Sequence, residues 1–541
     1  MTSYTYDLAG RLSTITDAMG QVKTFRYFPD GTLRSQQYSN LAPGTAAMAD
    51  VTFSYDTNFV RLATMTDGTG TTTNTYRPVG QLGALQPATV NGPLSGQSDM
   101  ITYTYDALGR LKTRNIGAGT NENLVTRHYD ALGRITNLVN NLGSFQFAYV
   151  DSTDRPSNAV YPNGQTTTFD YFPATGDHRL KTIHHKTGAT NTLSRFDYTH
   201  SPGGTITSWQ RQFGSAAATR YAFGYDMVDQ LTAATLAEAA DPSAVLKRLS
   251  YQYDKAGNRI STQQDTTLTT ATHNNVNELM ATSGGGKLLV AGHTDEPAKV
   301  TVNGQTAITD TNNNYRAWIN ATPGTNTITV VAQDWSTNAN RATNAWSVNV
   351  TGGAARTFTY DVNGNTLSDG LRTFQWDAEN RLVKVTKGTN TWEFVYNGLS
   401  QRVAEKLNGN VTRRWVLDGA EIVEERAADG TTVQRRFYPE GEQRLGGADA
   451  GSYYYSRDHL GSIREVTDST RTLRARYDFD PYGQREKLSG NLDCEFGFTG
   501  HLTHEATGLV LTLYRAYDAD TGRWLSRGDI VKSCVSEFSP V

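Results

Sequence analysis

The sequence predicts an all-β protein built from consecutive antiparallel hairpins, and three observations carry this prediction. A Tyr-Asp-x-x-Gly-Arg-Leu unit recurs in steps of about 20 residues, which suits two short strands and their turns. The composition is rich in turn and strand formers, with 50 Gly and 28 Tyr against only 37% apolar residues. Apolar and polar residues alternate before the tyrosines, as in 101–105, which is the period of a half-buried strand.

The repeat is seen most clearly at Tyr6-Asp7-Leu8-Ala9-Gly10-Arg11-Leu12. Further clear copies begin at Tyr105, Tyr129, Tyr253, Tyr360 and Trp376, and degenerate copies begin at Tyr27, Tyr55, Tyr76, Tyr171, Tyr198, Tyr225 and Tyr396. Aspartate favours the start of a turn, and glycine takes a positive φ at little cost. We expect the Asp and Arg of each unit to pair across the hairpin and to set its register. Because these aspartates recur throughout the array, we interpret them as structural and not as catalytic carboxylates.

A different β pattern interrupts the array. Residues 281–286, Ala-Thr-Ser-Gly-Gly-Gly, are expected to form a flexible linker. From Lys287 to Val350 the tyrosine signature is absent and short alternating runs replace it, before a second glycine pair at Gly352-Gly353. This predicts a small inserted β-sandwich that folds independently of the array. The segment resembles the bacterial Ig-like modules of surface proteins.

The region from Tyr453 to Asp529 carries an ordered series of further motifs. These are Arg457-Asp458-His459-Leu460-Gly461-Ser462, Asp480-Pro481-Tyr482-Gly483, Phe496-Gly497-Phe498-Thr499-Gly500-His501, Tyr514-Arg515-Ala516-Tyr517-Asp518 and Gly522-Arg523-Trp524-Leu525-Ser526-Arg527. The series resembles the core region of the RHS (rearrangement hot spot) family, which includes the C subunits of Tc toxins and the teneurin YD-shell. The Tyr-Asp units likewise resemble the YD repeat of this family, over roughly residues 1–280 and 351–530.

The resemblance implies a ribbon of hairpins that spirals into a complete or partial hollow shell. In the family, the interior of the shell can hold a C-terminal toxin domain. It divides the chain into a YD-repeat shell (1–283), the Ig-like insert (287–350), a continued shell (354–452), the RHS-associated core (453–530) and a divergent tail (531–541). Because a repeat begins at the first residues, we expect the chain to be a piece of a longer polypeptide that would carry any export signal.

Composition excludes some classes of function. The net charge of −3 gives no electrostatic case for binding nucleic acid. Two cysteines, Cys494 and Cys534, cannot form a disulfide framework. The first residues have no signal-peptide pattern, and no apolar run approaches the roughly 20 residues that span a bilayer.

Motifs that superficially suggest chemistry fail on their spacing, so we predict no catalytic, cofactor-binding or metal-ligating residues. The loop at Asp310 has Tyr315 and Ala321 where a calcium loop needs Gly and Glu, and is expected to be a polar hairpin tip. Gly284-Gly285-Gly286-Lys287 lacks the spacing of a phosphate loop. His184 and His185 should point to opposite faces of a strand. His501-Leu502-Thr503-His504-Glu505 does not have the order of a zinc-protease helix, and Cys494 has no partner motif.

Self-cleavage is implied only by the resemblance, since RHS cores commonly cleave themselves with aspartates of Asp-Pro motifs. Here Gly528 stands where that motif should begin, no proline follows Asp529, and no second Asp-Pro motif follows. Asp518 and Asp520 are expected to be solvated turn residues. We therefore predict that self-cleavage is lost, and a reading-frame change near Gly528 would explain the departure.

The leading hypothesis is a structural, non-enzymatic shell protein of the RHS or polymorphic-toxin type, whose full-length relatives encapsulate or display a C-terminal toxin cargo. This chain is expected to have no cargo domain of its own. Two alternatives remain open: a cell-surface module that binds carbohydrate or protein through exposed tyrosines, and a residual self-cleaving aspartyl protease. Expected partners are a toxin cargo, a second shell subunit, or a surface glycan or protein, with no nucleic acid and no membrane span. By resemblance the protein is secreted or on the cell surface.

Overall fold

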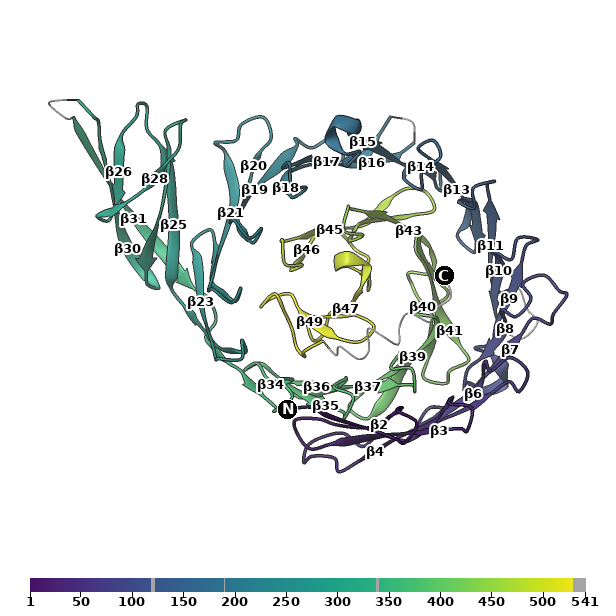
Figure 1. Cartoon of the computed structure of the whole chain (residues 1–541). Coiled ribbons are helices and arrows are strands. Elements are labelled where there is room, and N and C mark those ends of the chain that lie inside the picture. Colours follow the sequence, from purple (N-terminus) through teal and green to yellow (C-terminus); the bar gives the residue numbers. More distant parts are fainter. Residues whose placement is uncertain (118–121, 189, 337–339, 529–541) are drawn as a thin grey trace.

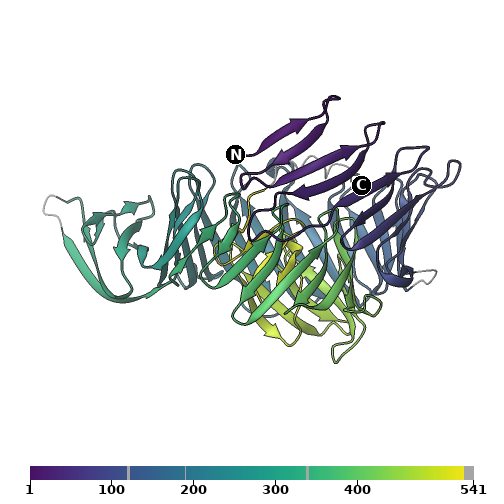
Figure 2. The ribbon, with the colours of Figure 1, turned by 90° about the horizontal axis from the view of Figure 1, so that it is seen from below.

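The computed structural model describes residues 1–117, 122–188, 190–336 and 340–528, and it confirms the predicted all-β fold. Strands and turns make up the described chain apart from three short 3-10 turns. Figure 1 shows a spiral ribbon with three nested parts: an outer wall, an inner wall and a small group of C-terminal strands at the centre. An insert projects from one side of the spiral, as the turned view in Figure 2 also shows.

The outer wall is formed by 24 strands, each of which pairs antiparallel with the next along the chain. They are β1 (Ser3–Tyr6), β2 (Leu12–Thr16), β3 (Val22–Tyr27), β4 (Leu33–Ser39), β5 (Val51–Tyr55), β6 (Leu62–Asp67), β7 (Gly70–Tyr76), β8 (Pro87–Asn91), β9 (Ile101–Tyr105), β10 (Leu111–Ile116), β11 (Asn123–Tyr129), β12 (Ile135–Asn140), β13 (Gly143–Tyr149), β14 (Pro156–Val160), β15 (Gln165–Tyr171), β16 (Leu180–Thr187), β17 (Thr192–His200), β18 (Ile206–Phe213), β19 (Thr219–Tyr225), β20 (Leu231–Glu238), β21 (Val245–Tyr253), β22 (Arg259–Gln264), β23 (Thr267–His273) and β24 (Leu279–Gly284). The 3-10 turns η1 (Ser95–Gln97) and η2 (Ala174–Gly176) lie in its loops.

The inner wall is a 14-stranded sheet with the same sequential antiparallel order. Its strands are β33 (Thr359–Tyr360), β34 (Thr366–Ser368), β35 (Arg372–Trp376), β36 (Leu382–Lys387), β37 (Asn390–Tyr396), β38 (Arg402–Leu407), β39 (Asn410–Asp418), β40 (Glu421–Ala427), β41 (Val433–Tyr438), β42 (Gly441–Arg444), β43 (Gly451–Arg457), β44 (Ile463–Asp468), β45 (Leu473–Phe479) and β46 (Arg485–Gly490). The central group consists of η3 (Phe498–Gly500), β47 (Leu502–His504), β48 (Leu509–Leu511), β49 (Ala516–Asp518) and β50 (Arg523–Trp524).

The predicted hairpin unit is present, and its residues also join neighbouring hairpins. In the copy at Tyr129, Asp130 Oδ1 accepts the backbone N–H groups of Leu132 and Arg134, and Asp130 Oδ2 accepts Arg134 Nε at 2.7 Å. The Arg134 guanidinium then lies 4.7 Å from the ring centroid of Tyr149, whose hydroxyl donates to the Ile135 carbonyl at 2.7 Å. The same linkage recurs between Arg11 and Tyr27, Arg61 and Tyr76, Arg110 and Tyr129, and Arg381 and Tyr396. The expected Asp–Arg pair is confirmed, and it is part of a tie between successive hairpins.

One predicted copy of the repeat is wrong, and the copy at Tyr149 is not among the predicted ones. Tyr198 lies inside β17 and not at its end, because its ring packs between the walls and is buried. His200 ends that strand instead, at the position where the register shifts. Tyr149 ends β13 with the same register shift but was not predicted, because no aspartate follows it directly.

The apolar core lies between the layers. Ile101 and Tyr103 of the outer wall pack with Val416 and Val423 of the inner wall. A second cluster joins the inner wall to the central strands, through Phe374, Trp376, Leu382, Val385, Trp392, Phe394, Trp415, Leu502, Leu509, Leu511, Ala516 and Leu525. Each wall therefore buries one face against the next turn of the spiral.

The insert consists of two sheets around one core. β25 (Gly286–His293), β29 (Asn314–Ala321) and β28 (Ile308–Thr309) form one sheet. β27 (Gln305–Thr306), β26 (Lys299–Val302), β30 (Gly324–Gln333) and β31 (Arg341–Gly352) pair in that order on the other side. The core between them includes Val302, Ile319 and Ile328 and also Leu268 of the outer wall.

The glycine stretch at 281–286 is not the flexible linker that we predicted. Ala281–Gly284 pair in β24, and the short strand β32 (Arg356–Thr357) adds to the same edge. The end of β31 also pairs in parallel with β23. The glycines allow the two backbone segments that enter and leave the insert to lie close together. A Cβ added to Gly284 would lie only 2.7 Å from the Cα of Gly352, where the chain leaves the insert.

Candidate functional site

The central strands meet the inner wall through a network of buried ion pairs. Arg413 of β39 contacts Glu405 at 2.8 Å, Glu425 at 3.0 Å and Glu495 at 2.7 Å. Burial by itself would lower the pKa of Arg413, but the three carboxylates raise it above its usual range. His504 of β47 lies 3.3 Å from Glu405, so the network ties the centre of the spiral to its wall.

A second network ties the inner wall to the outer wall. Arg464 is fully buried, and its Nη2 donates to Asp478 Oδ1 at 2.6 Å. The same carboxylate accepts Arg211 Nη1 of the outer wall at 2.5 Å. Although burial would raise the pKa of Asp478, the two arginines hold it at about 2.

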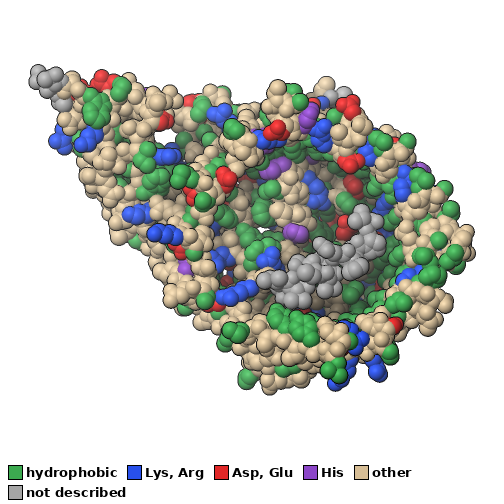
Figure 3. Space-filling model, viewed as in Figure 1, with side chains coloured by type: hydrophobic (Ala, Val, Ile, Leu, Met, Phe, Trp, Pro, Cys, Tyr) green, Lys and Arg blue, Asp and Glu red, His purple; other side chains and the backbone are tan. Residues whose placement is uncertain are grey.

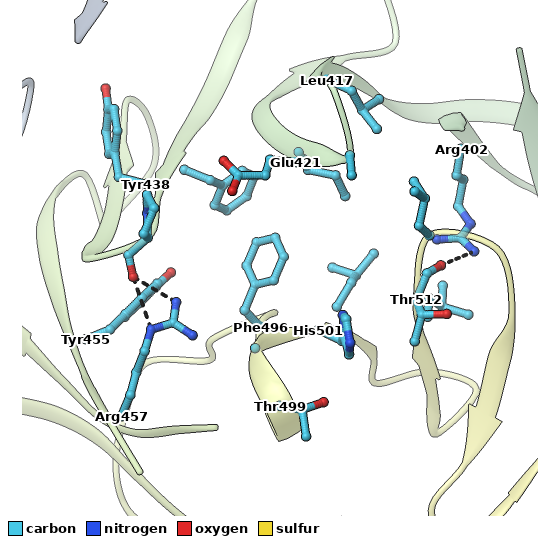
Figure 4. A pocket seen from close by; sticks show the side chains of 18 residues that line it. Arg402, Leu417, Glu421, Tyr438, Tyr455, Arg457, Phe496, Thr499, His501 and Thr512 are labelled. Carbon is cyan, nitrogen blue, oxygen red and sulfur yellow. Dashed lines mark hydrogen bonds between the residues drawn. The ribbon is translucent and has the colours of Figure 1, made fainter. Parts of the chain in front are cut away.

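A cavity of about 440 Å³ lies between the inner wall and the central strands (Figure 4). Its lining comes from β38, β43 and the β39–β40 and β41–β42 turns with the strand ends beside them on one side. On the other side it comes from Phe496, from Thr499 to Leu502 and from Leu511 to Leu513. Most of the lining is apolar, and Figure 4 shows Phe496 between the two sides. This volume is within the range of small-molecule sites.

Two arginines bring positive charge to this cavity. Arg402 is buried, with 5% of its surface exposed, and its Nη2 donates to the Thr512 carbonyl at 3.3 Å. Arg457 donates from Nε and Nη2 to the Pro439 carbonyl at 3.1 and 2.8 Å, and from Nη1 to the Gly461 carbonyl at 2.7 Å. Figure 4 shows them at opposite ends of the cavity. Both arginines thus bind backbone oxygens.

A smaller cavity of about 180 Å³ lies between the outer wall and the inner wall. Trp209, Tyr221 and Phe223 line it from the outer wall, and His459, Arg464 and Phe479 line it from the inner wall. Burial lowers the pKa of His459, so its imidazole stays neutral at neutral pH.

The structure separates the histidines and cysteine that sequence reasoning considered. His184 lies 3.0 Å from Thr192 Oγ1, whereas His185 contacts Thr167 Oγ1 and the Arg457 carbonyl. Cys494 is buried, and burial raises the pKa of its thiol to about 12, so the thiolate nucleophile does not form at neutral pH. Cys534 lies outside the described residues.

The remaining motifs form turns and strands. His501 lines the large cavity, His504 is on a strand, and Glu505 pairs with Arg485. Asp310 is at a hairpin turn, where it accepts the N–H groups of Asn312 and Asn314. The other rejected motif, at 284–287, spans the end of β24 and the start of β25. Within the described ranges, no cluster of three or more His, Cys, Asp or Glu side chains is arranged to hold a metal ion.

The expectation for Asp518 is wrong, whereas Asp520 is exposed as expected. Asp518 is 1% exposed and lies 3.1 Å from Arg372, which also pairs with Asp369. The central strands are enclosed by the wall, so a residue of turn type becomes part of a buried ion cluster. Asp520 pairs with Arg356 at 2.6 Å. Asp529 and the tail at 531–541, on which the self-cleavage prediction depends, lie outside the described residues.

Sequence reasoning did not find Arg402 or Arg457 as site residues. Arg457 precedes the Asp458-His459 motif, and Arg402 follows a degenerate repeat at Tyr396, so both look like ordinary members of the array. Only the position of the central strands turns them into the lining of a cavity.

Comparisons with known proteins place the chain among shell proteins. The family model described as Teneurin YD-shell matches residues 51–176 and 349–533. A tRNA3(Ser)-specific nuclease WapA of Bacillus spizizenii is 31% identical over 175 residues, which cover 31% of this chain and 8% of the relative. Double-stranded DNA deaminase toxin A of Burkholderia cenocepacia is 25% identical over 215 residues, covering 32% of this chain and 15% of that protein.

Among solved structures, the crystal structure of TcdB2-TccC3 aligns with 97% of this chain and 33% of its own, at 13% identity and a TM-score of 0.27. The chain therefore spans only a small part of the curated relatives and about a third of this structure. In the described part of the chain, no helix has the length and apolar character needed to cross a membrane.

Proposed function

The chain belongs to the teneurin YD-shell family, and from this premise we propose that it is a structural wall that encloses or displays a toxin cargo in longer relatives. The nested arrangement supports this proposal most directly. The outer wall, the inner wall and the central strands form successive layers, and the chain lies at the centre of the spiral from β47 to β49 (Figure 1). A segment that follows the central strands would thus start inside the wall.

The role that we propose for this chain is structural and not enzymatic. Its repeated aspartates are engaged in turns and ion pairs, as Asp130 is with Arg134. The nuclease and deaminase activities in the relatives' names belong to those proteins, of which the chain matches 8% and 15%. We infer that the shared part is shell. The partners we propose are a toxin cargo or a second shell subunit, and the location we propose is extracellular or at the cell surface.

Protease protection of an epitope tests this function. An epitope fused after Val541 should resist an added protease and should not be bound by its antibody in the folded protein. The same epitope fused before Met1 is the matched control, because β1 is exposed along its whole length, and it should be cleaved rapidly. Equal cleavage of the two epitopes in folded protein would contradict the proposed enclosure.

A further inference from the structure

The cavity between the inner wall and the central strands has the composition of a ligand site. Its walls include Leu417, Ile422, Phe437, Phe496 and Leu511, and it encloses about 440 Å³. Ligand pockets of this type are mostly apolar, with a few polar groups that fix the orientation of the ligand.

Arg402 supplies a buried positive charge without a counter-ion among the described residues. Its two hydrogen bonds are long, at 3.3 Å to the Thr512 carbonyl and 3.4 Å to the Tyr396 hydroxyl. Its Nε is buried and has no hydrogen-bond partner in the described chain. Burying an unpaired charge is costly, so such a group gains strongly from an anion.

Most other buried arginines of this protein lie next to a carboxylate that neutralises their charge. Carboxylates lie within 4 Å of Arg211, Arg372, Arg381, Arg426, Arg444 and Arg464. Arg114 lacks such a contact, but Asp418 and Glu424 act on it electrostatically and it lines neither cavity. Among the described residues, Arg402 is therefore the buried arginine that lines a cavity with no carboxylate within 4 Å.

The other charged groups at the cavity leave this positive charge unneutralised. Arg457 lines it too, and its hydrogen bonds go to backbone carbonyls. Glu421 is the acidic residue on the lining, and its side chain is exposed to solvent, which screens its charge. Glu440 lies near Arg457, and burial raises its pKa to about 7, so it is largely protonated below that pH.

We propose that this cavity binds a small amphipathic carboxylate, such as an aliphatic acid. The apolar body occupies the space beside Phe496, and the carboxylate accepts hydrogen bonds from the Arg402 guanidinium. A charge-assisted bond between guanidinium and carboxylate is the strong type of hydrogen bond. The ligand thus satisfies the unpaired Nε and fills the apolar cavity at once.

Titration calorimetry with decanoate, and with decanol as a neutral probe of the same length, tests the proposal on the full chain. Decanoate should bind with one-to-one stoichiometry and at least about tenfold more tightly than decanol, the ratio that about 1.4 kcal/mol provides. Arg402→Met should remove this preference while keeping the apolar volume. Arg26→Met, which removes an exposed arginine of the outer wall, is the matched control and should bind as the unaltered protein does.

A second variant separates loss of binding from loss of folding. Ala420 lines the cavity and is exposed, so Ala420→Trp should narrow the entrance without disturbing the core. We expect it to weaken both probes while the urea midpoint stays unchanged. Undetectable binding of decanoate, or equal affinity for acid and alcohol in the unaltered protein, would overturn the proposal, as would a preference that survives Arg402→Met.

Discussion

At the residue scale, the repeat uses one Asp–Arg pair in environments of different burial. Asp7 and Arg11 have 26% and 33% of their side-chain surfaces exposed, whereas the values for Asp377 and Arg381 are 2% and 10%. Exposed ion pairs contribute little to stability because water competes for both charges. Removing one partner of a buried pair leaves the other charge unpaired, and this is costly.

Asp377→Asn should therefore destabilise the protein by about 3 kcal/mol, because Arg381 loses its buried counter-ion. The amide keeps the side-chain oxygen that accepts the turn N–H groups of Glu379 and Arg381, so the change tests the charge itself. Urea unfolding followed by tryptophan fluorescence gives the measurement. Asp7→Asn is the matched control and should shift the midpoint much less; equal shifts would show that burial of the pair does not matter.

At the scale of elements, stability depends on how the two walls are joined. His185 of β16 accepts a hydrogen bond from Thr167 and donates from Nε2 to the Arg457 carbonyl at the end of β43, at 2.9 Å. Burial lowers the pKa of His185 to about 4 from an ordinary value of 6.5. The neutral imidazole is therefore part of the contact between outer and inner wall.

This pKa predicts a loss of stability in mild acid. The unfolded chain takes up a proton at His185 near pH 6.5, whereas the folded protein does so only near pH 4. The stability that His185 contributes is thus complete above pH 6.5 and is lost as the pH falls from 6.5 to 4.

His185→Gln should reduce the difference between urea midpoints measured at pH 7.5 and pH 4.5, because glutamine does not titrate. His128→Gln replaces an exposed histidine of the outer wall and should leave the difference as it is in the unaltered protein. If the two variants respond alike to acid, His185 is not the group that titrates.

At the scale of the whole molecule, the insert has two sheets of its own, and it also packs against and pairs with the outer wall. Its core has Val302 and Ile319 at its centre, yet Leu268 of β23 belongs to the same cluster. β31 also continues from the insert into parallel pairing with β23. The two glycine-rich crossings therefore fix the position of the insert on the wall.

We expect residues 286–352, which extend the predicted insert (287–350) to the ends of β25 and β31, to fold when expressed alone, because most of their core comes from within the segment. The segment should give dispersed amide resonances and a cooperative melt. Val302→Asp places a charge at a position that is 0% exposed, and should abolish both signs of folding. A wild-type segment that resembles this variant would show that the wall is required.

The sequence by itself determined the hairpins, because each depends on residues close together in the chain. The turn at Tyr129 needs only Asp130, Gly133 and Arg134, so its Asp–Arg pair and its strands could be predicted. The same local reasoning excluded a zinc helix at His501–Glu505 and a calcium loop at Asp310. It missed Tyr149, which ends its strand with the register shift of the repeat but has no aspartate directly after it. It misplaced Tyr198, because the register shift of that strand lies at His200.

The tertiary structure alone decided which hairpins face one another across the layers. Arg211 meets Asp478 from 267 residues away, and Arg402 meets the Thr512 carbonyl from 110 residues away. Such contacts depend on the radius of the spiral and on where the insert interrupts it, and no short motif encodes either. Burial of Asp518, the ion pairs at the centre and the cavity beside Arg402 all follow from this winding, because enclosure by a second layer turns surface positions into interior ones.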